Sequence, residues 1–262
     1  RILTRLECPY PAWDGLNLSW EMLEGLAKHN GPVFEPGWAL AQVDAAFPLD
    51  LSSHASLEAQ IAAIADDIAY DNHDIDDGLR AGLLDFDDLL SLEPMQRSWD
   101  RVRAAYPEAS VRRQRAEMIR QNIGVMVNDV IASTRARIEQ LKIGSQADVR
   151  ACGVQLGGFS DGLAEAEKTH KRFMYDRLYH HPSQMEAARI SGEIVRTLFA
   201  AYEEQPEHLP GEWHARLSGD PVQRTRHIAD FIAGMTDRFA IARYRDLAGP
   251  LDDSDPLAQS LL

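Results

Sequence analysis

Apolar residues recur at spacings of three and four positions along most of the chain, the pattern of helices that bury one face. The period-two alternation that predicts strands is almost absent. The pattern predicts helices over residues 19–29, 39–46, 56–78, 86–92, 94–106, 110–142, 163–179, 183–202, 213–218 and 221–247. We therefore expect an all-α protein built as an irregular multi-helix bundle.

Glycine and proline mark the breaks between these helices. Residues 8–17 hold two prolines and are expected to form a loop, as is the glycine-rich stretch 153–162. Asp220 followed by Pro221 is a strong start signal for the last helix. The polar tail from Gly249 is expected to lack regular structure. Because Gly144 ends the longest helix, we expect two parts, residues 1–144 and a C-terminal helical subdomain, 145–262.

Two of the predicted helices carry long apolar stripes at helical spacing. On helix 56–78 the stripe consists of Leu57, Ile61, Ile64, Ile68, Ile75 and, just beyond its end, Leu79. On helix 110–142 it consists of Ile119, Ile123, Met126, Val127, Val130, Thr134, Ile138 and Leu141. We expect both stripes to face the core.

The composition narrows the class of protein. The 262 residues carry a formal net charge of −14 and only two cysteines, Cys8 and Cys152, which share no metal-binding spacing. We therefore expect neither structural zinc nor a disulfide framework, and we favour a reducing cytoplasm. No apolar run approaches the roughly 18 residues that span a bilayer, so no membrane partner is expected. The acidic balance argues against a dedicated nucleic-acid-binding protein.

Helix 56–78 carries the most informative polar residues. Asp66, Tyr70, His73, Asp74 and Asp77 stand at i, i+4, i+7, i+8 and i+11, so all five share one face beside the apolar stripe. A row of carboxylates needs positive partners, which could be a metal, Lys and Arg side chains, or solvent cations. A solvated acidic face is the simpler interpretation. Small residues nearby, namely Ala62, Ala63, Ala65 and Ala69, favour close approach by another element.

The run Ala65-Asp66-Asp67-Ile68-Ala69-Tyr70, followed by Asp74 and Asp77-Gly78-Leu79, resembles the A-D-x-I-A-Y helix of the dGTPase-like branch of HD-domain phosphohydrolases. Other segments are similar to further signatures of that family. They are Arg1-Ile2-Leu3-Thr4-Arg5-Leu6-Glu7, Leu16-Asn17-Leu18-Ser19 with Gly25-Leu26-Ala27-Lys28-His29, Lys171-Arg172-Phe173-Met174-Tyr175 with Tyr179, and Ala233-Gly234-Met235-Thr236-Asp237-Arg238-Phe239-Ala240. The resemblance covers nearly the whole chain.

The resemblance implies a dNTP triphosphohydrolase, with dGTP the favoured substrate. A metal-bound water would attack the α-phosphate and release deoxynucleoside and tripolyphosphate. Asp66 matches the last Asp of the H…HD…D site for a divalent metal, which could be Mg, Mn or Co. Tyr70 and Asp74 match residues that contact the deoxyribose 3′-hydroxyl. Lys171 matches a phosphate-contacting position, and Tyr179 matches the aromatic that crowds the 2′ position.

The first His and the HD pair of the family precede the segment that resembles Arg1–Glu7, so they are not in this sequence. His73-Asp74 is not taken as that pair, because it follows Tyr70 by less than one turn. Residues 1–144 would then be the C-terminal part of the HD-type catalytic core. We expect the chain alone to bind metal weakly and to hydrolyse nothing, and we expect an intact parent protein to be the enzyme. The chain opens like one cut inside a longer protein.

Several alternatives remain open. Asp237 and Arg238 are candidates for an allosteric nucleotide or inter-subunit contact, since relatives assemble as homo-oligomers regulated by dNTPs, or for an internal ion pair. Arg112, Arg113 and Arg115 could contact single-stranded DNA or form a solvated turn. His170, His180 and His181 are expected at the surface or in a polar network. The rival functions are a non-catalytic helical module that binds nucleotide or partner subunits, and an HD hydrolase acting on another nucleotide.

Overall fold

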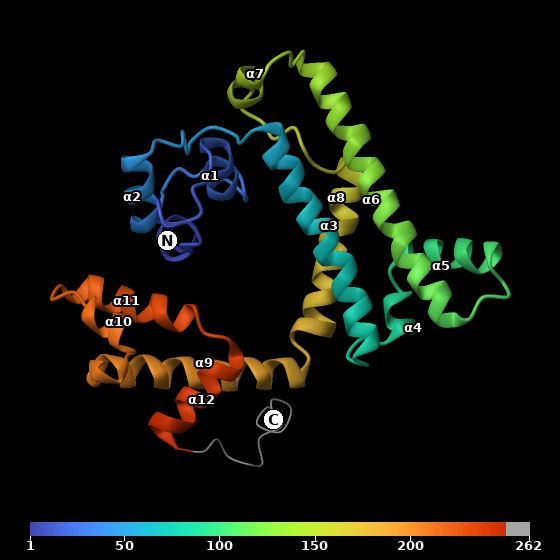
Figure 1. Cartoon of the computed structure of the whole chain (residues 1–262). Coiled ribbons are helices and arrows are strands. Elements are labelled where there is room, and N and C mark those ends of the chain that lie inside the picture. The colour runs from blue at the N-terminus through green and yellow to red at the C-terminus, as the bar shows by residue number, and fades with distance from the viewer. Residues whose placement is uncertain (250–262) are drawn as a thin grey trace. The chain divides into compact units, whose positions relative to one another are not determined.

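The computed structural model describes residues 1–249, and every regular element in that range is a helix (Figure 1). The predicted all-α class is confirmed. The predicted tail, residues 250–262, lies outside the described residues. None of the described helices has the length and apolar composition needed to cross a bilayer.

The chain forms two compact units. The first comprises Leu16–Tyr179 together with Arg1, and the second comprises Ile2–Gly15 together with the chain from His180 onward. The units therefore divide in sequence after Tyr179, within the C-terminal part that the sequence places at 145–262. A domain boundary at Gly144 stays a prediction.

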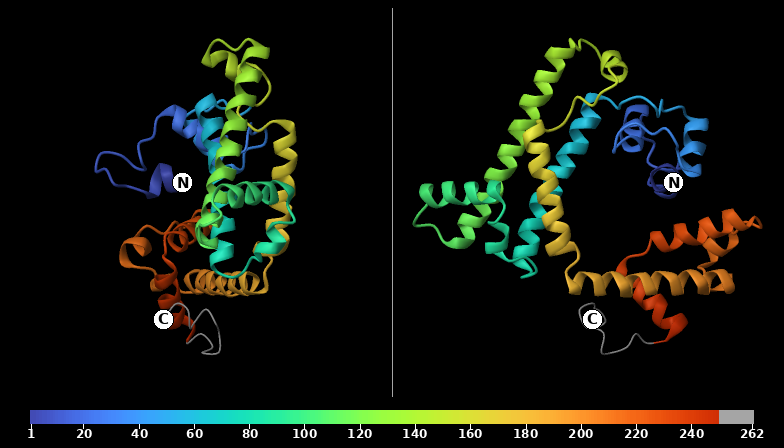
Figure 2. Two further views of the ribbon diagram at one scale, coloured as in Figure 1. Left: turned by 90° about the vertical axis from the view of Figure 1, so that its right-hand side faces the viewer. Right: turned by 180° about the vertical axis from the view of Figure 1, so that it is seen from behind.

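The first unit contains all the long helices of the N-terminal and central chain. They are α1 (Trp20–Ala27), α2 (Trp38–Ala46), α3 (Leu57–Arg80), α4 (Phe86–Leu89), α5 (Glu93–Ala105), α6 (Val111–Leu141), α7 (Gln146–Ala151) and α8 (Asp161–Met174), and α8 continues into a π-helical turn, η2 (Tyr175–Tyr179). Helix α3 packs along α6, and Lys171 of α8 pairs with Asp67 of α3; the right-hand view of Figure 2 shows these three helices next to one another. The six-residue α7 was not predicted, because so short a helix shows no periodicity.

Polar side chains at the helix starts explain where these helices begin. Ser56 accepts a hydrogen bond from the backbone N–H of Ala59, and Ser160 accepts one from Leu163. Such caps satisfy N–H groups that the first helical turn leaves without partners. At the other end of the longest helix, Lys142 adopts a left-handed conformation with φ of 55°, which ends α6 two residues before Gly144.

The predicted apolar stripes largely form the core of the first unit. Ile68 and Ile75 of α3 are buried, and so are Ile119, Met126 and Val130 of α6. The prediction is wrong for two residues of α6, because Val127 and Leu141 are exposed. Leu141 is the last residue of the 31-residue α6 and lies beyond the last buried residue of that helix, Thr134.

The second unit has its own core. Its elements are η1 (Ile2–Leu6), α9 (Pro182–Glu204), η3 (Pro206–His208), α10 (Gly211–Ala215), α11 (Pro221–Ala233) and α12 (Asp237–Ala248). Tyr202 is fully buried, and its ring meets Phe231 edge to face at 5.4 Å between centroids. The single helix predicted over 221–247 is wrong. Gly234 ends α11, and Thr236 caps α12 by accepting from the Phe239 N–H at 3.3 Å.

A buried ion cluster joins α1 to α7 within the first unit. Glu24 has no exposed surface, and its carboxylate accepts from Lys28 at 3.0 Å and from Arg150 at 2.8 and 3.0 Å. Lys28 is buried as well. The guanidinium of Arg150 also lies over the ring of Trp20. One carboxylate thus balances two cations that have little access to water.

Replacing Glu24 by alanine is therefore expected to destabilise the chain by about 3 to 5 kcal/mol, because both cations lose their counter-charge while remaining buried. Urea unfolding followed by circular dichroism measures this free energy. Glu21→Ala, an exposed carboxylate on the same helix, is the control and should change stability by less than about 1 kcal/mol. Equal effects of the two substitutions would contradict the expectation.

Candidate functional site

Helix α3 presents its polar residues on one side because its other side is anchored in the core. Its start is capped by Ser56, and Ile68 and Ile75 are buried. Asp66, Tyr70 and Asp74 consequently share the opposite face, as the sequence predicts. The side chain of Asp66 is 75% exposed and Tyr70 is 56% exposed, whereas Asp74 is half-buried. The face is solvated at its N-terminal end, where Ala62 and Ala65 are exposed rather than covered by another element.

Tyr179 joins two of these residues in one cluster. Its hydroxyl donates a hydrogen bond to Asp74 Oδ2 at 2.5 Å. Its ring centroid lies 6.1 Å from that of Tyr70 and 5.2 Å from that of Tyr175, which it meets edge to face. Burial raises the pKa of the Tyr179 phenol above its usual range, and the hydrogen bonds to Asp74 and Tyr70 raise it further. Tyr179 therefore remains a proton donor to Asp74 at any physiological pH.

The π-helical turn η2 places Tyr179 against α3. Leu178 is buried against Gly78, where a Cβ atom would come within 3.1 Å of the leucine side chain. Arg177 pairs with Asp88 of α4 at 3.1 Å. Three successive residues of the turn thus hold three separate contacts. Gly78 is needed because a side chain there would push the turn away from α3.

Lys171 forms a second cluster on α8. Its ammonium lies 3.3 Å from Asp67 Oδ1 and also pairs closely with Glu167, one helical turn earlier. Burial alone would lower the pKa of Lys171, but the hydrogen bond to Glu167 and the negative charges of Glu167, Asp67 and Asp71 raise it to about 12. The Lys171 side chain is thus charged at neutral pH and lies beside Asp67, the residue that follows Asp66.

Among the described residues, the side chain of Asp66 has one ionisable partner. His29 Nε2 lies 3.8 Å from Asp66 Oδ2. A carboxylate and an imidazole are donors that suit Mn, Co or Zn, and a carboxylate alone suits Mg. Within residues 1–249, no three His, Cys, Asp or Glu side chains gather closely enough to hold a metal ion. The donors present therefore fit part of a metal site, with Asp66 as one open ligand.

The start of α8 is fixed from α6, which sets the position of Lys171 and Tyr179. Asp129 accepts hydrogen bonds from both the N–H and the hydroxyl of Ser160, each at 2.7 Å. Arg137 donates to the backbone carbonyls of Leu156, Gly158 and Phe159. These bonds satisfy backbone groups of the glycine-rich segment that precedes α8.

Two buried polar residues were not predicted to be buried. Asp71 is 3% exposed, and burial raises its pKa to about 7, an effect that Lys171 partly opposes. His170 is 8% exposed, so of the two settings expected for it the surface is wrong. Burial lowers its pKa, and the nearby backbone of Asp71 partly opposes this. The burial of Asp71 could have been predicted from its position in the sequence, because Asp71 and Asn72 lie between Ile68 and Ile75 in the apolar stripe.

The remaining candidates lie apart from this cluster in the sequence and on other elements. Asp237 and Arg238 begin α12 in the second unit, both are exposed, and neither forms an ion pair with another described residue. Arg112 and Arg113 are exposed at the start of α6, whereas Arg115 lies over the ring of Phe86 at 4.1 Å. The functional roles of these residues stay predictions.

Comparison with known proteins identifies relatives of this chain. Residues 157–246 match the model of the phosphohydrolase-associated domain. A deoxyguanosinetriphosphate triphosphohydrolase-like protein of Parvibaculum lavamentivorans is 44% identical over 95% of this chain and 66% of its own length. A protein of the same description from Jannaschia sp. is 42% identical over 100% of this chain and 67% of its own length. One from Cereibacter sphaeroides is 44% identical over 95% of this chain and 67% of its own length.

These matches and the helical fold indicate the HD-domain phosphohydrolases as the class of protein. The chain belongs to the family of deoxyguanosinetriphosphate triphosphohydrolase-like proteins, and the resemblance predicted from its motifs is confirmed. It spans about two thirds of the length of these relatives.

The raised pKa of Asp71 leads to a pH-dependent prediction. Its folded pKa of about 7 exceeds the ordinary value of 3.8, so the folded state binds the extra proton and loses stability as pH rises from about 4 to 7. The Asp71→Asn variant has no titrating group at this position, so its free energy of unfolding does not show this decrease with pH. The stability of Asp71→Asn relative to the unmodified chain should therefore rise over that range, by at most about 4 kcal/mol, and stay level above pH 7.

Urea unfolding at half-unit steps between pH 4.5 and 8 measures this difference. The groups that act on Asp71, namely Lys171, Glu167, Asp67 and Asp74, are present in both proteins, so their own titration largely cancels. Asp77→Asn, an exposed carboxylate three turns from Asp66 on α3, is the control and should follow the unmodified chain. A constant difference between Asp71→Asn and the unmodified chain would contradict the expectation.

Proposed function

We propose that the full-length protein carrying this chain is a dNTP triphosphohydrolase, with dGTP as the favoured substrate, that releases deoxynucleoside and tripolyphosphate. The observation that carries the proposal is the cluster of Tyr70, Asp74 and Tyr179 beside Lys171, in a chain whose relatives are named for dGTP hydrolysis. Aromatic rings and a carboxylate can bind a deoxyribose, and a fixed cation nearby can bind the phosphates of the same nucleotide.

The aromatic cluster would bind the deoxyribose. Asp74 is held by the Tyr179 hydroxyl through one carboxylate oxygen, so its other oxygen can accept a hydrogen bond from the 3′-hydroxyl. Tyr70 exposes much of its ring next to Tyr179 and can cover one face of the sugar. The ring of Tyr179 would occupy the space that a 2′-hydroxyl needs. Discrimination against ribonucleotides would thus rest on shape.

Lys171 would neutralise charge on the phosphates. Its pKa of about 12 keeps it charged at neutral pH, and Glu167 fixes its position from the same helix. Asp67 occupies one side of the ammonium, and a phosphate oxygen could replace or join that contact. Lys171 would thus supply this positive charge from α8.

Asp66 would be the ligand that this chain contributes to a divalent metal, with Mg, Mn and Co as candidates. When bound, such a cation supplies a nucleophile by lowering the pKa of a water molecule to near neutrality. Asp66 is exposed, and among the described ionisable side chains it contacts only the imidazole of His29, so its oxygens are open to a cation. The other ligands would come from a part of the protein that matches the rest of the relatives' length. The chain alone would then bind metal weakly and be inactive.

The full protein would act in the cytoplasm as a homo-oligomer, with single-stranded DNA or a dNTP as a candidate effector and Asp237 and Arg238 as candidate contact residues. Two rivals remain testable. A non-catalytic helical module would use the same cluster only to bind nucleotide or partner subunits. An HD hydrolase of another nucleotide would have no need of a 2′-excluding ring.

The first test measures tripolyphosphate in the full-length protein with dGTP, dATP or GTP and with Mg²⁺, Mn²⁺ or Co²⁺. Tripolyphosphate should form from the deoxynucleotides and fall at least about 100-fold in Asp66→Ala, since a metal ligand is lost. The control is Asp77→Ala, an exposed carboxylate on the same helix, which should retain activity. Absence of tripolyphosphate with every metal and dNTP effector would favour the non-catalytic module.

Tyr179 gives a sharper test of sugar recognition. Tyr179→Phe keeps the ring but removes the hydrogen bond to Asp74, so kcat/KM for dGTP should fall about 10-fold while GTP remains rejected. Tyr179→Ala removes the ring, and the ratio of kcat/KM for dGTP to that for GTP should fall towards one. An unchanged ratio in Tyr179→Ala would exclude Tyr179 as the residue that discriminates between the sugars.

A further inference from the structure

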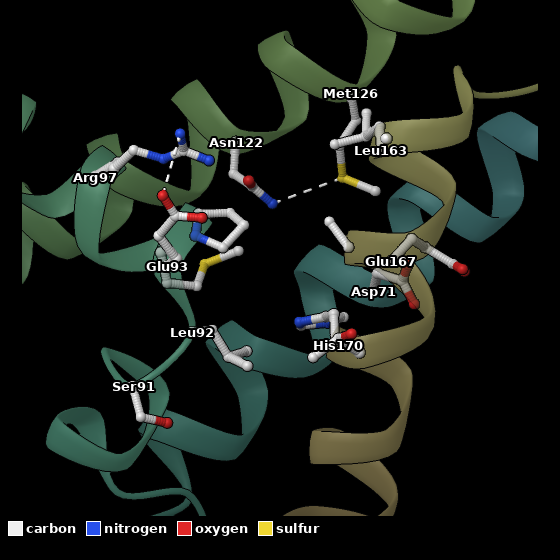
Figure 3. Close-up of a pocket in the computed structure, with 15 residues that line it drawn as sticks. Asp71, Ser91, Leu92, Glu93, Arg97, Asn122, Met126, Leu163, Glu167 and His170 are labelled. Carbon is white, nitrogen blue, oxygen red and sulfur yellow. Dashed lines mark hydrogen bonds and ion pairs between the residues drawn. The ribbon is translucent and has the colours of Figure 1, made fainter.

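A pocket of about 350 Å³ lies inside the first unit, between α3, the start of α5, α6 and α8 (Figure 3). None of the residues proposed above to bind metal, sugar or phosphate lines it. Asp71 and His170 come from neighbouring helices at one side of the pocket, and Glu93 and Arg97 lie on the other side. Its volume is within the range of small-molecule sites in proteins.

The pocket contains buried polar atoms that have no partner in the described structure. Asp71 is 3% exposed, and its Oδ2 makes no hydrogen bond. His170 is 8% exposed, and its ring nitrogens have no side-chain partner, although the backbone of Asp71 lies near the ring. Leaving a buried polar atom unsatisfied costs about 1 to 3 kcal/mol, so Asp71 Oδ2 and an unpaired nitrogen of His170 at one pocket require an explanation. A ligand that pairs with them is the explanation tested below.

The rest of the wall defines the chemistry of that ligand. Leu92, Met95, Met126 and Leu163 give the pocket an apolar surface that suits a ring. Its acidic residues are Asp71, Glu93 and Glu167, and its basic residue, Arg97, is already paired with Glu93 at 3.3 Å. Burial keeps the imidazole of His170 neutral near pH 7, so it can accept a hydrogen bond without repelling a cation.

We propose that this pocket binds a small organic cation in which a planar amidinium or guanidinium group is carried on a compact apolar body. One N–H of the group would be donated to Asp71 Oδ2 and another to the unprotonated nitrogen of His170. The apolar body would lie against the leucine and methionine side chains. A planar group with several N–H donors satisfies a carboxylate better than an ammonium does.

Benzamidine is the probe, because it joins an amidinium to a phenyl ring. Its binding to the 262-residue chain at pH 7.5 is measured by calorimetry and by amide chemical shifts in NMR spectra, without any turnover. Binding should be saturable, and it should be weaker by at least about 10-fold for benzamide, which lacks the charge, and absent for benzoate. The measurement is independent of phosphohydrolase activity, so failure of either proposal leaves the other standing.

Two variants locate the site. Asp71→Asn removes the carboxylate and should weaken benzamidine binding at least about 10-fold. Ala166→Phe fills the pocket without changing a charge and should abolish binding, which keeps the test decisive if Asp71→Asn folds poorly. Asp77→Asn, on the exposed face of α3, is the control and should bind like the unmodified chain. The proposal would be overturned if the unmodified chain and the three variants bound benzamidine equally, or if the unmodified chain bound benzoate as well as benzamidine. It would also be overturned if benzamidine showed no saturable binding.

Discussion

Two buried amide side chains hold α3 in one register, and the proposed site depends on that register. Gln60 accepts hydrogen bonds from the backbone N–H groups of Leu156 and Gly157 at 2.8 and 2.9 Å, and it donates to the carbonyl of Ala55. Asn72 accepts from Asn122 of α6 at 2.8 Å and donates to the carbonyl of Ile68. Apolar packing alone tolerates small slides and rotations, but a displaced amide loses its partners at about 1 to 3 kcal/mol each. The outward face of α3 is therefore fixed before any ligand arrives.

The charge on that face sets a second condition. The chain carries a net charge of −14, and the proposed substrate is itself a polyanion. Lys171 pairs with Asp67, the residue after Asp66, and with Glu167. A phosphate must therefore compete with Asp67 for Lys171, and a metal at Asp66 would offset the repulsion. Substrate and metal would thus favour each other's binding.

The sequence predicted the fold class, most helices and the shared face of Tyr70 and Asp74, whereas the contact of Tyr179 with Asp74 was not predicted. Those predictions succeeded where a long apolar period or a helix cap specified the structure, as at Ser56 and Asp220. They failed where a single residue or a distant contact decided the outcome. Thr236 caps a helix that periodicity alone would continue through Gly234. Asp71 and His170 are buried only because α3, α6 and α8 pack together, and local sequence patterns do not predict such packing. The pairing of Lys171 with Asp67 likewise depends on a contact across 104 positions of sequence.

The π-helical turn at Tyr175–Tyr179 has a consequence for how this family can diverge. A π turn holds one residue more than an α turn, and here Arg177, Leu178 and Tyr179 each make a different contact because of that extra residue. Deleting one residue from the turn would rotate all three away from Asp88, Gly78 and Asp74 together. Substitutions at those positions would instead act one contact at a time. A one-codon deletion in the gene would therefore remove the proposed sugar contacts of the turn while leaving every side chain of the α3 face unchanged.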